Sequence, residues 1–370
     1  MNQFTYCVPC LFGLEGLVGD ELRRMDAGNV RVENGHVYFE GGEDLLARAN
    51  LRLRMGERVL LKLGEFPANT WDELFEGVAA LPWEDFIPRD GKFPVKGHSL
   101  DSKLHSIPTC QAMIQKAVAK RLGAKYHLQR LPATGETYQI QFSIRKDRAE
   151  LFLDTSGAGL HKRGYRAVGN DAPLRETLAA AMVTLARDRG RDVFVDPFCG
   201  SGTIVIEAAL AALNRAPGLT RGFSAEKWAC IPKEVWQLER TAAMDREFRG
   251  EYRIFGSDND PNSLNIAIAN AKKAGVSGLI RFSEADATRL ELPGDGGVVV
   301  CNPPYGERMM ERRSAQRLYQ QLGRHWQGKD GWKKYIISSE PEFERYYGKK
   351  AAKKRKLYNG MIQCNLYMYF

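Results

Sequence analysis

Short alternating blocks of apolar and polar residues, separated by turn-forming residues, occupy the first part of the chain. The blocks predict strands at 4–9, 30–32 and 36–39 and helices at 13–25 and 45–51. Asn34 and Gly35 stand between two of these strands, where a tight hairpin turn favours them. The strand–helix–strand–strand–helix order predicts a small α+β unit of ferredoxin-like type over residues 1–54.

The same kind of pattern continues over residues 55–160 and predicts a second α+β unit. Its strands are expected at 59–66, 92–96, 138–144 and 149–154, and its helices at 71–81 and 107–122. A chain of 370 residues is too long for one hydrophobic core. We therefore expect residues 161–370 to form a third unit.

In this third unit, apolar strands end on polar residues and are followed by helices. Strands at 193–196, 252–258 and 280–286 end on Asp196, Asp258 and Asp286, and the apolar run 298–300 precedes Asn302. The alternation predicts an α/β fold with a Rossmann-like, doubly wound sheet, which binds ligands at the carboxyl ends of its strands. Asn359 and Gly360 separate two further alternating stretches and predict a C-terminal hairpin that closes this sheet.

A glycine-rich turn follows the first of these strands and consists of Asp196, Pro197, Phe198, Cys199, Gly200, Ser201, Gly202 and Thr203. Its glycines allow the backbone to pass close to a ligand. The turn is not a P-loop, and it does not match the dinucleotide-binding fingerprint. A turn without a ligand is the ordinary alternative, and each aspartate alone suits a helix N-cap. The ordered set of turn and acidic strand ends predicts a ligand site.

The strongest chemical signal is the segment Asn302-Pro303-Pro304-Tyr305, directly after a buried strand. The Asn302 amide oxygen and the Pro303 carbonyl suit the two N–H groups of an exocyclic amine on a nucleobase, and Tyr305 can stack on the ring. Accepting those hydrogens orients a weakly nucleophilic amine and stabilises the positive charge that develops on it. Two prolines after a strand also form an ordinary rigid turn. The preceding acidic strand ends favour the catalytic interpretation.

Composition describes a globular protein with a basic balance. Hydrophobic residues make up 44% and charged residues 27%, and the formal net charge of +9 points to a polyanionic partner. We expect RNA contacts from basic residues in two stretches, namely Lys162, Arg163, Arg166, Lys353 and Lys354. Seven scattered cysteines and the lack of a secretory signal predict reduced thiols and a cytoplasmic location. The irregular spacing of the histidines predicts no metal site.

The ordered motifs resemble the S-adenosylmethionine-dependent amino-group methyltransferases, and most closely the THUMP-domain RNA guanine-N2 methyltransferases. The segments 159–166 and 172–180 resemble the bridge of that family from its THUMP domain to its catalytic domain. The resemblance implies that residues 55–160 are a THUMP domain that docks RNA. It also implies S-adenosylmethionine as cofactor, with its methionine part at the Asp196–Gly202 turn, its ribose at Asp258 and its adenine at Asp286. Asn259, Ala287 and Thr203 are expected beside them.

One departure concerns the spacing of the acidic strand ends. Asp196 and Asp258 are 62 positions apart, whereas a simple strand–helix–strand step places the acid about 20 residues beyond the turn. The excess lies in residues 216–248. Two interpretations stay open for this insertion: an excursion on the substrate side of the sheet, or a passive helical elaboration.

The resemblance implies methylation of guanine N2 in RNA, with large-subunit ribosomal RNA preferred over transfer RNA. An adenine-N6 DNA methyltransferase is an alternative, because the Asn-Pro-Pro-Tyr motif also serves that reaction. Glutamine-N5 methylation of a protein uses the same motif but does not explain the basic balance. A non-catalytic RNA-binding assembly factor is the alternative from another class, and the full set of polar strand ends argues against it.

Overall fold

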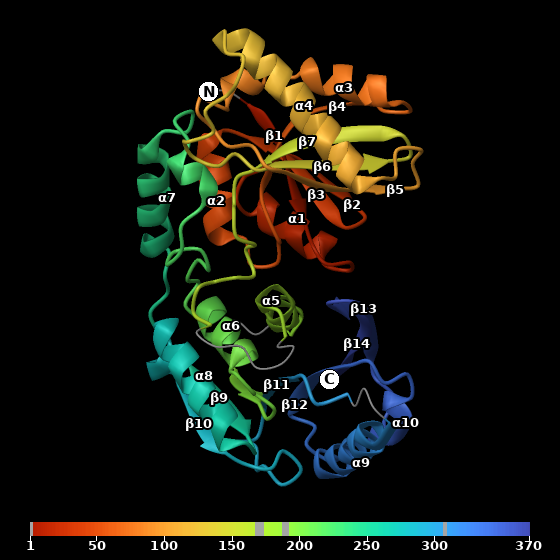
Figure 1. Ribbon diagram of the computed structural model, residues 1–370. Helices are drawn as coiled ribbons and strands as arrows, with labels where there is room; N and C mark the ends of the chain where they lie inside the picture. Colours follow the sequence, from red (N-terminus) through yellow and green to blue (C-terminus); the bar gives the residue numbers. More distant parts are fainter. Residues whose placement is uncertain (1–2, 167–173, 187–191, 306–308) are drawn as a thin grey trace.

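The computed structural model describes residues 3–166, 174–186, 192–305 and 309–370. Figure 1 shows an N-terminal part above a C-terminal part, each built around a sheet of seven strands. None of the helices in these ranges is long and apolar enough to cross a membrane.

The N-terminal part is one continuous sheet in the order β2-β3-β1-β4-β7-β6-β5. Its first elements are β1 (Phe4–Pro9), α1 (Glu15–Arg23), β2 (Gly28–Glu33), β3 (His36–Gly41) and α2 (Glu43–Arg52). The later elements are β4 (Leu60–Pro67), α3 (Trp71–Ala79), β5 (Val95–Leu100), α4 (Ile107–Tyr126), β6 (Ile140–Arg145) and β7 (Arg148–Asp154). The predicted order of strands and helices is thus confirmed, although β5 begins three residues later than expected.

The sequence did not reveal that the two N-terminal units share a sheet. β1 pairs antiparallel with β3 on one side and with β4 on the other, where Tyr6 lies opposite Leu61. Tyr6, Phe39 and Leu61 point to one face and belong to the main core. The side chains at the alternate positions point to the opposite face of the sheet. There Cys7, Tyr38, Leu60 and Phe152 form a smaller apolar cluster. The pairing of β1 with β4 therefore joins both units into one body.

The C-terminal part has the predicted doubly wound sheet, in the order β10-β9-β8-β11-β12-β14-β13. Its elements are α5 (Glu176–Leu185), β8 (Val193–Asp196), α6 (Thr203–Ala212), α7 (Lys233–Asp245), β9 (Arg253–Asp258), α8 (Pro261–Lys273), β10 (Ile280–Glu284), β11 (Gly297–Cys301), α9 (Met309–His325), β12 (Trp332–Ser338), α10 (Phe343–Tyr347), β13 (Lys353–Asn359) and β14 (Ile362–Tyr369). The neighbouring strands β10, β9, β8, β11 and β12 run parallel. β14 pairs antiparallel with β12 and forms the expected hairpin with β13. β12, α9 and α10 were not anticipated.

The insertion at residues 216–248 connects the two parts of the molecule. Its helix α7 lies beside α2 (Figure 1), where Glu239 accepts hydrogen bonds from Arg48 at 2.7 Å and from Arg52 at 3.3 Å. The Trp228 ring stacks on Tyr138 with 5.0 Å between centroids. These contacts favour the second interpretation of the insertion, a structural elaboration that holds the N-terminal sheet against the C-terminal part.

Arg163 belongs to the same junction, and the prediction that it contacts RNA is wrong. Its side chain is buried and donates to the backbone carbonyls of Leu160 and Arg54 and, at 3.4 Å, to the Glu207 carboxylate. Burial raises the pKa of Glu207, and the charge of Arg163 opposes that rise. Arg163 is therefore the counter-charge of a buried acid on α6.

Replacing Arg163 tests this structural role. We expect Arg163→Ala to lower the free energy of unfolding by about 3–5 kcal/mol, because the buried Glu207 carboxylate loses its ion-pair partner and keeps only the hydrogen bond from the Tyr165 hydroxyl. Thermal melting of the purified variant measures the loss. Lys162→Ala is the matched control, because Lys162 is the exposed neighbour of Arg163 and should melt as the wild type does. Equal melting of all three proteins would contradict the assignment.

Candidate functional site

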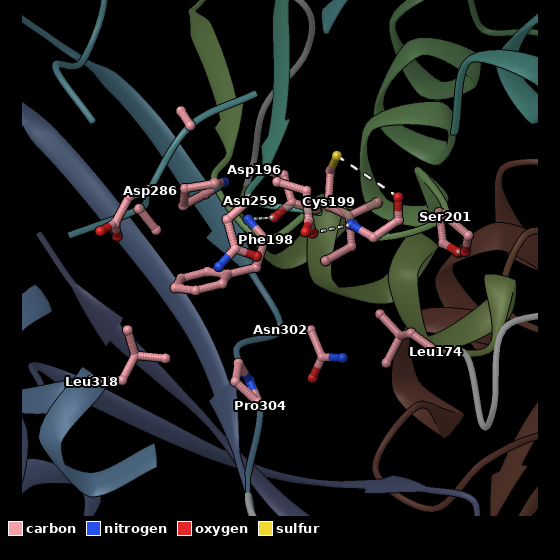
Figure 2. Close-up of a pocket in the computed structure, with 17 residues that line it drawn as sticks. Leu174, Asp196, Phe198, Cys199, Ser201, Asn259, Asp286, Asn302, Pro304 and Leu318 are labelled. Carbon is pink, nitrogen blue, oxygen red and sulfur yellow. Dashed lines mark hydrogen bonds between the residues drawn. The ribbon is translucent and has the colours of Figure 1, made fainter. Parts of the chain in front are cut away.

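A cavity of about 420 Å³ opens at the carboxyl ends of the parallel strands (Figure 2). The predicted residues that line it are Asp196, Pro197, Phe198, Gly200, Thr203, Asp258, Asn259, Asp286, Ala287, Asn302 and Pro304. Gly202, Pro303 and Tyr305 are not among its lining residues. The structure thus brings the glycine-rich turn, both further acidic strand ends and the Asn-Pro-Pro-Tyr segment to one place.

Strand register explains why these residues meet. In the parallel pairs, Asp196 lies opposite Gly256, and Asp258 lies opposite Glu284. β11 pairs with β8 through Val299 and Val195, so Asn302 emerges at the same edge of the sheet. Parallel strands all point their carboxyl ends to one edge, which is why residues far apart in the sequence become neighbours.

Asp196 is a buried acid with an unused oxygen. Its side chain is 1% exposed, and Oδ1 accepts a hydrogen bond from the Phe198 backbone N–H at 3.1 Å. Oδ2 is buried without a hydrogen-bond partner in the described part of the chain. Burial raises the pKa of Asp196 to about 8, and the nearby charge of Asp258 adds to the rise. A cationic ligand group at this position would compensate the carboxylate.

Asp258 is held by the turn that it faces. Its Oδ2 accepts from the Gly200 backbone N–H at 2.8 Å, and its Oδ1 accepts from the Asp260 N–H at 3.1 Å. Each carboxylate oxygen has a second lone pair, so two hydroxyl groups of a ligand can still donate to it. Gly200 has a φ of 50° and open space where a Cβ would lie, which suits close approach of a ligand to the backbone.

Gly202 also meets a packing requirement that the sequence did not indicate. Its φ is 84°, and a Cβ at this position would lie 3.0 Å from the Ala267 side chain. Glycine is therefore required here for the turn into α6 and for the packing of that turn on α8. The contact of Gly202 with the cofactor stays a prediction.

The far end of the cavity combines an acid with apolar surfaces. Asp286 accepts hydrogen bonds from the Thr288 side chain at 2.7 Å and backbone N–H at 2.9 Å, which lowers its pKa. Phe198 and Ala287 line this end, as does Leu318 of α9. Sequence reasoning missed Leu318 because α9 itself was not predicted. It also missed Leu174, Ile204 and Ala285, which are apolar lining residues without a motif.

The Asn-Pro-Pro-Tyr segment differs in part from expectation. The Tyr305 hydroxyl donates to the Asn302 Oδ1, so the tyrosine holds the amide that was predicted to hold the amine. Tyr319 donates to the Pro304 carbonyl at 2.8 Å, and this bond fixes the turn. Figure 2 shows Asn302 and Pro304 across the cavity from Phe198 and Asn259. The stacking function of Tyr305 stays a prediction.

The other basic residues that were expected to contact RNA differ in their exposure to solvent and in their ion pairs. Arg166 is partly buried, and it donates to Glu176 at 3.1 Å and to Thr203 at 3.0 Å at the cavity wall, so its contact with RNA stays a prediction. Lys162 and Lys353 are exposed. Lys354 is exposed and paired with Glu344 at 2.8 Å. For the three lysines, RNA contact stays a prediction.

Three family models match the chain. Residues 5–60 match the RlmL ferredoxin-like domain, and residues 68–154 match the THUMP domain. Residues 163–368, more than half of the chain, match the RMKL-like methyltransferase domain. Together these matches agree with the predicted succession of ferredoxin-like, THUMP and catalytic units.

Two relatives show how far the similarity extends. The chain is 42% identical to "Putative RNA methyltransferase YpsC" of Bacillus subtilis, over 100% of this chain and 97% of that protein. It is 36% identical to "Ribosomal RNA large subunit methyltransferase K/L" of Psychromonas ingrahamii, over 99% of this chain and 50% of that protein. The chain thus spans about half the length of the K/L protein.

Solved structures share the whole architecture. A "predicted N6-adenine-specific DNA methylase" from Listeria monocytogenes is 45% identical, with a TM-score of 0.95 over 100% of this chain and 97% of that one. The protein SMU.472, "a putative methyltransferase complexed with SAH", is 36% identical, with a TM-score of 0.95 over 100% and 98% of the two chains. TrmN from Thermus thermophilus, at 20% identity and a TM-score of 0.72 over 99% of both chains, shows the fold alone.

The raised pKa of Asp196 predicts a pH-dependent cost to stability. Between the ordinary pKa of 3.8 and the folded value of about 8, the folded protein keeps a proton that the unfolded chain releases. Stability from this group is therefore lost as the pH rises through that window, at up to about 1.4 kcal/mol per pH unit. We expect Asp196→Asn to be more stable than the wild type at pH 8, and this advantage to shrink towards pH 5. Melting of both proteins without ligand across this range measures it, and a constant difference would contradict the burial argument.

Proposed function

Because the chain belongs to the RMKL-like methyltransferase family, we propose that it transfers a methyl group from S-adenosylmethionine to the exocyclic N2 of a guanine in RNA. Large-subunit ribosomal RNA is the preferred substrate. The similarity to a K/L relative of that description and the match of residues 68–154 to the THUMP domain support the choice of RNA.

One observation carries the proposal. A single cavity is lined both by Asn302 and by the acids Asp196 and Asp258, which suit the two ends of the cofactor. The unpartnered Oδ2 of Asp196 suits the positively charged methionine end. Asp258, oriented by the turn at Gly200, suits the two ribose hydroxyls. Asp286 and the apolar surface of Phe198 suit the adenine.

The catalytic work of the protein is orientation. The cofactor supplies an electrophilic methyl group on its sulfonium, so no strong general base is required. Asn302 Oδ1 and the Pro303 carbonyl accept the two hydrogens of the guanine amine and aim the nitrogen for in-line displacement. The nitrogen–carbon bond forms as the sulfur–carbon bond breaks, and the extra proton then leaves to water. The Tyr305 hydroxyl holds the Asn302 amide in place.

Asn302→Ala separates catalysis from cofactor binding. We expect kcat to fall about 100-fold or more, because the amine loses a fixed acceptor in the transition state. Cofactor affinity, measured by calorimetry, should stay within about threefold, because the acids proposed to bind the cofactor are unchanged in this variant. Asp258→Ala is the complementary variant and should weaken cofactor binding instead. Normal turnover by Asn302→Ala would remove Asn302 from the mechanism.

Product analysis tests the substrate. Unmodified large-subunit ribosomal RNA, transfer RNA and DNA are each incubated with the protein and S-adenosylmethionine, and the nucleosides are analysed by mass spectrometry. We expect N2-methylguanosine in ribosomal RNA alone. N2-methylguanosine in transfer RNA alone would change the substrate class. N6-methyladenine in DNA alone would overturn the RNA proposal and agree with the name of the Listeria relative.

A further inference from the structure

The tip of the β13–β14 hairpin extends past the edge of the sheet that carries the site. Ser338, at the end of β12, lies opposite Asn365 of β14, so residues 362–364 continue beyond the parallel strands. Tyr305 packs against the core cluster that contains Cys364 of this extension, and the two side chains are close enough to shift each other's pKa. The hairpin tip therefore borders the Asn-Pro-Pro-Tyr segment directly.

Apolar and aromatic side chains lie exposed at this tip. Met361 in the turn is 98% exposed, and Phe12, from the loop between β1 and α1, is 57% exposed. The Phe12 and Tyr358 rings meet edge to face, with 6.0 Å between their centroids. The Lys356 ammonium lies 5.4 Å from the centre of the Tyr358 ring. We call Phe12, Lys356, Tyr358 and Met361 the rim cluster.

The position of Phe12 is fixed by the catalytic part of the chain. The Arg355 guanidinium donates to the Gly13 carbonyl at 3.2 Å through Nε. A Cβ on Gly13 would lie 2.7 Å from the Lys356 carbonyl, so the loop and β13 are in close contact. The aromatic pair is thus presented jointly by the two parts of the molecule, in a defined position.

A groove leads from Phe12 along the N-terminal sheet. Phe12 also lines a cavity of about 420 Å³ that includes the small apolar cluster around Tyr38, on the face opposite the main core. Arg145 lines the same cavity, together with His36, His98 and the acids Asp101 and Glu150. Exposed aromatic rings beside a lysine, as in the rim cluster, suit a single nucleic-acid strand, because bases stack on the rings and phosphates pair with the cation.

We propose that Phe12 and Tyr358 form a stacking subsite for an unpaired RNA base next to the target guanine. The inference rests on the proposed function, because it takes RNA as the substrate of the neighbouring Asn302. Lys356 and the basic balance of the chain favour a polyanionic strand over an apolar protein partner. Stacking on a ring tolerates any base, so the subsite selects unpaired structure and not sequence.

Fluorescence anisotropy with a fluorescein-labelled single-stranded 12-nucleotide RNA, and with the same RNA in a duplex, tests the subsite. We expect the wild type to bind the single strand more tightly than the duplex. Phe12→Ala and Tyr358→Ala should each weaken single-strand binding about 5- to 100-fold, in line with the loss of one stacking platform. Phe12→Leu should weaken it similarly, because it keeps the apolar volume and loses the aromatic face.

Phe248→Ala is the matched control, because Phe248 is 60% exposed and lies in the insertion, outside the rim cluster. It should bind as the wild type does, and unchanged melting of each variant excludes a folding defect. Single-strand binding by Phe12→Ala and Tyr358→Ala equal to that of the wild type would overturn the subsite. Full binding by Phe12→Leu would also overturn it, because apolar packing would then suffice.

Methyl transfer to large-subunit ribosomal RNA by the same preparations separates this inference from the proposed function. An active wild type with an unchanged kcat/KM in Phe12→Ala would refute the subsite and leave the proposed function intact. A wild type that methylates no RNA would refute the proposed function. In that case a loss of single-strand binding in Phe12→Ala would still support the stacking site.

Discussion

The parallel pairing of β8, β9, β10 and β11 is the constraint on which the site depends. Asp196, Asp258 and Asp286 are distant in sequence, and only the common direction of these strands brings them to one cavity. Side chains alternate between the faces of a strand, so a slip of one residue would turn the side chains of that strand to the wrong face. The valines of β11 are buried on both faces of the strand, as is usual in a parallel sheet.

The acids of this cavity are maintained by different means. Asp196 has no counter-ion among the described residues. Its burial disfavours the charged carboxylate, and this raises its pKa. Glu207, one helix away, has Arg163 as its buried partner. An acid without a partner beside a binding cavity is ready to receive a cationic group, whereas an acid with a partner holds two parts of a chain together. The presence or absence of a buried partner thus distinguishes the binding-site acid Asp196 from the structural acid Glu207.

The sequence predicted the strand ends well, because a buried strand followed by a polar residue is a local pattern. The prediction for Arg163 was wrong because a basic run in the sequence does not reveal whether its side chains face water or pair with a buried acid. Here the acid, Glu207, comes 44 residues later. The close approach of Gly202 to Ala267 could not be predicted, because Ala267 comes from another helix. The continuous N-terminal sheet could not be foreseen either, since the pairing of β1 with β4 joins segments with no shared motif. Long-range contacts account for each of these differences.

The edge strand β13 of the C-terminal sheet bears on whether two copies of this protein can associate through their sheets. β13 is the outer strand of its sheet, and an outer strand offers unpaired backbone groups to any other strand that approaches. Here the Gly13 loop lies against Lys356, and the start of the strand carries exposed Lys353 and Lys354. Charged side chains at a sheet edge disfavour pairing with another strand, because a second copy that approached along the edge would have to bury them. The exposed lysines of β13 are of this kind.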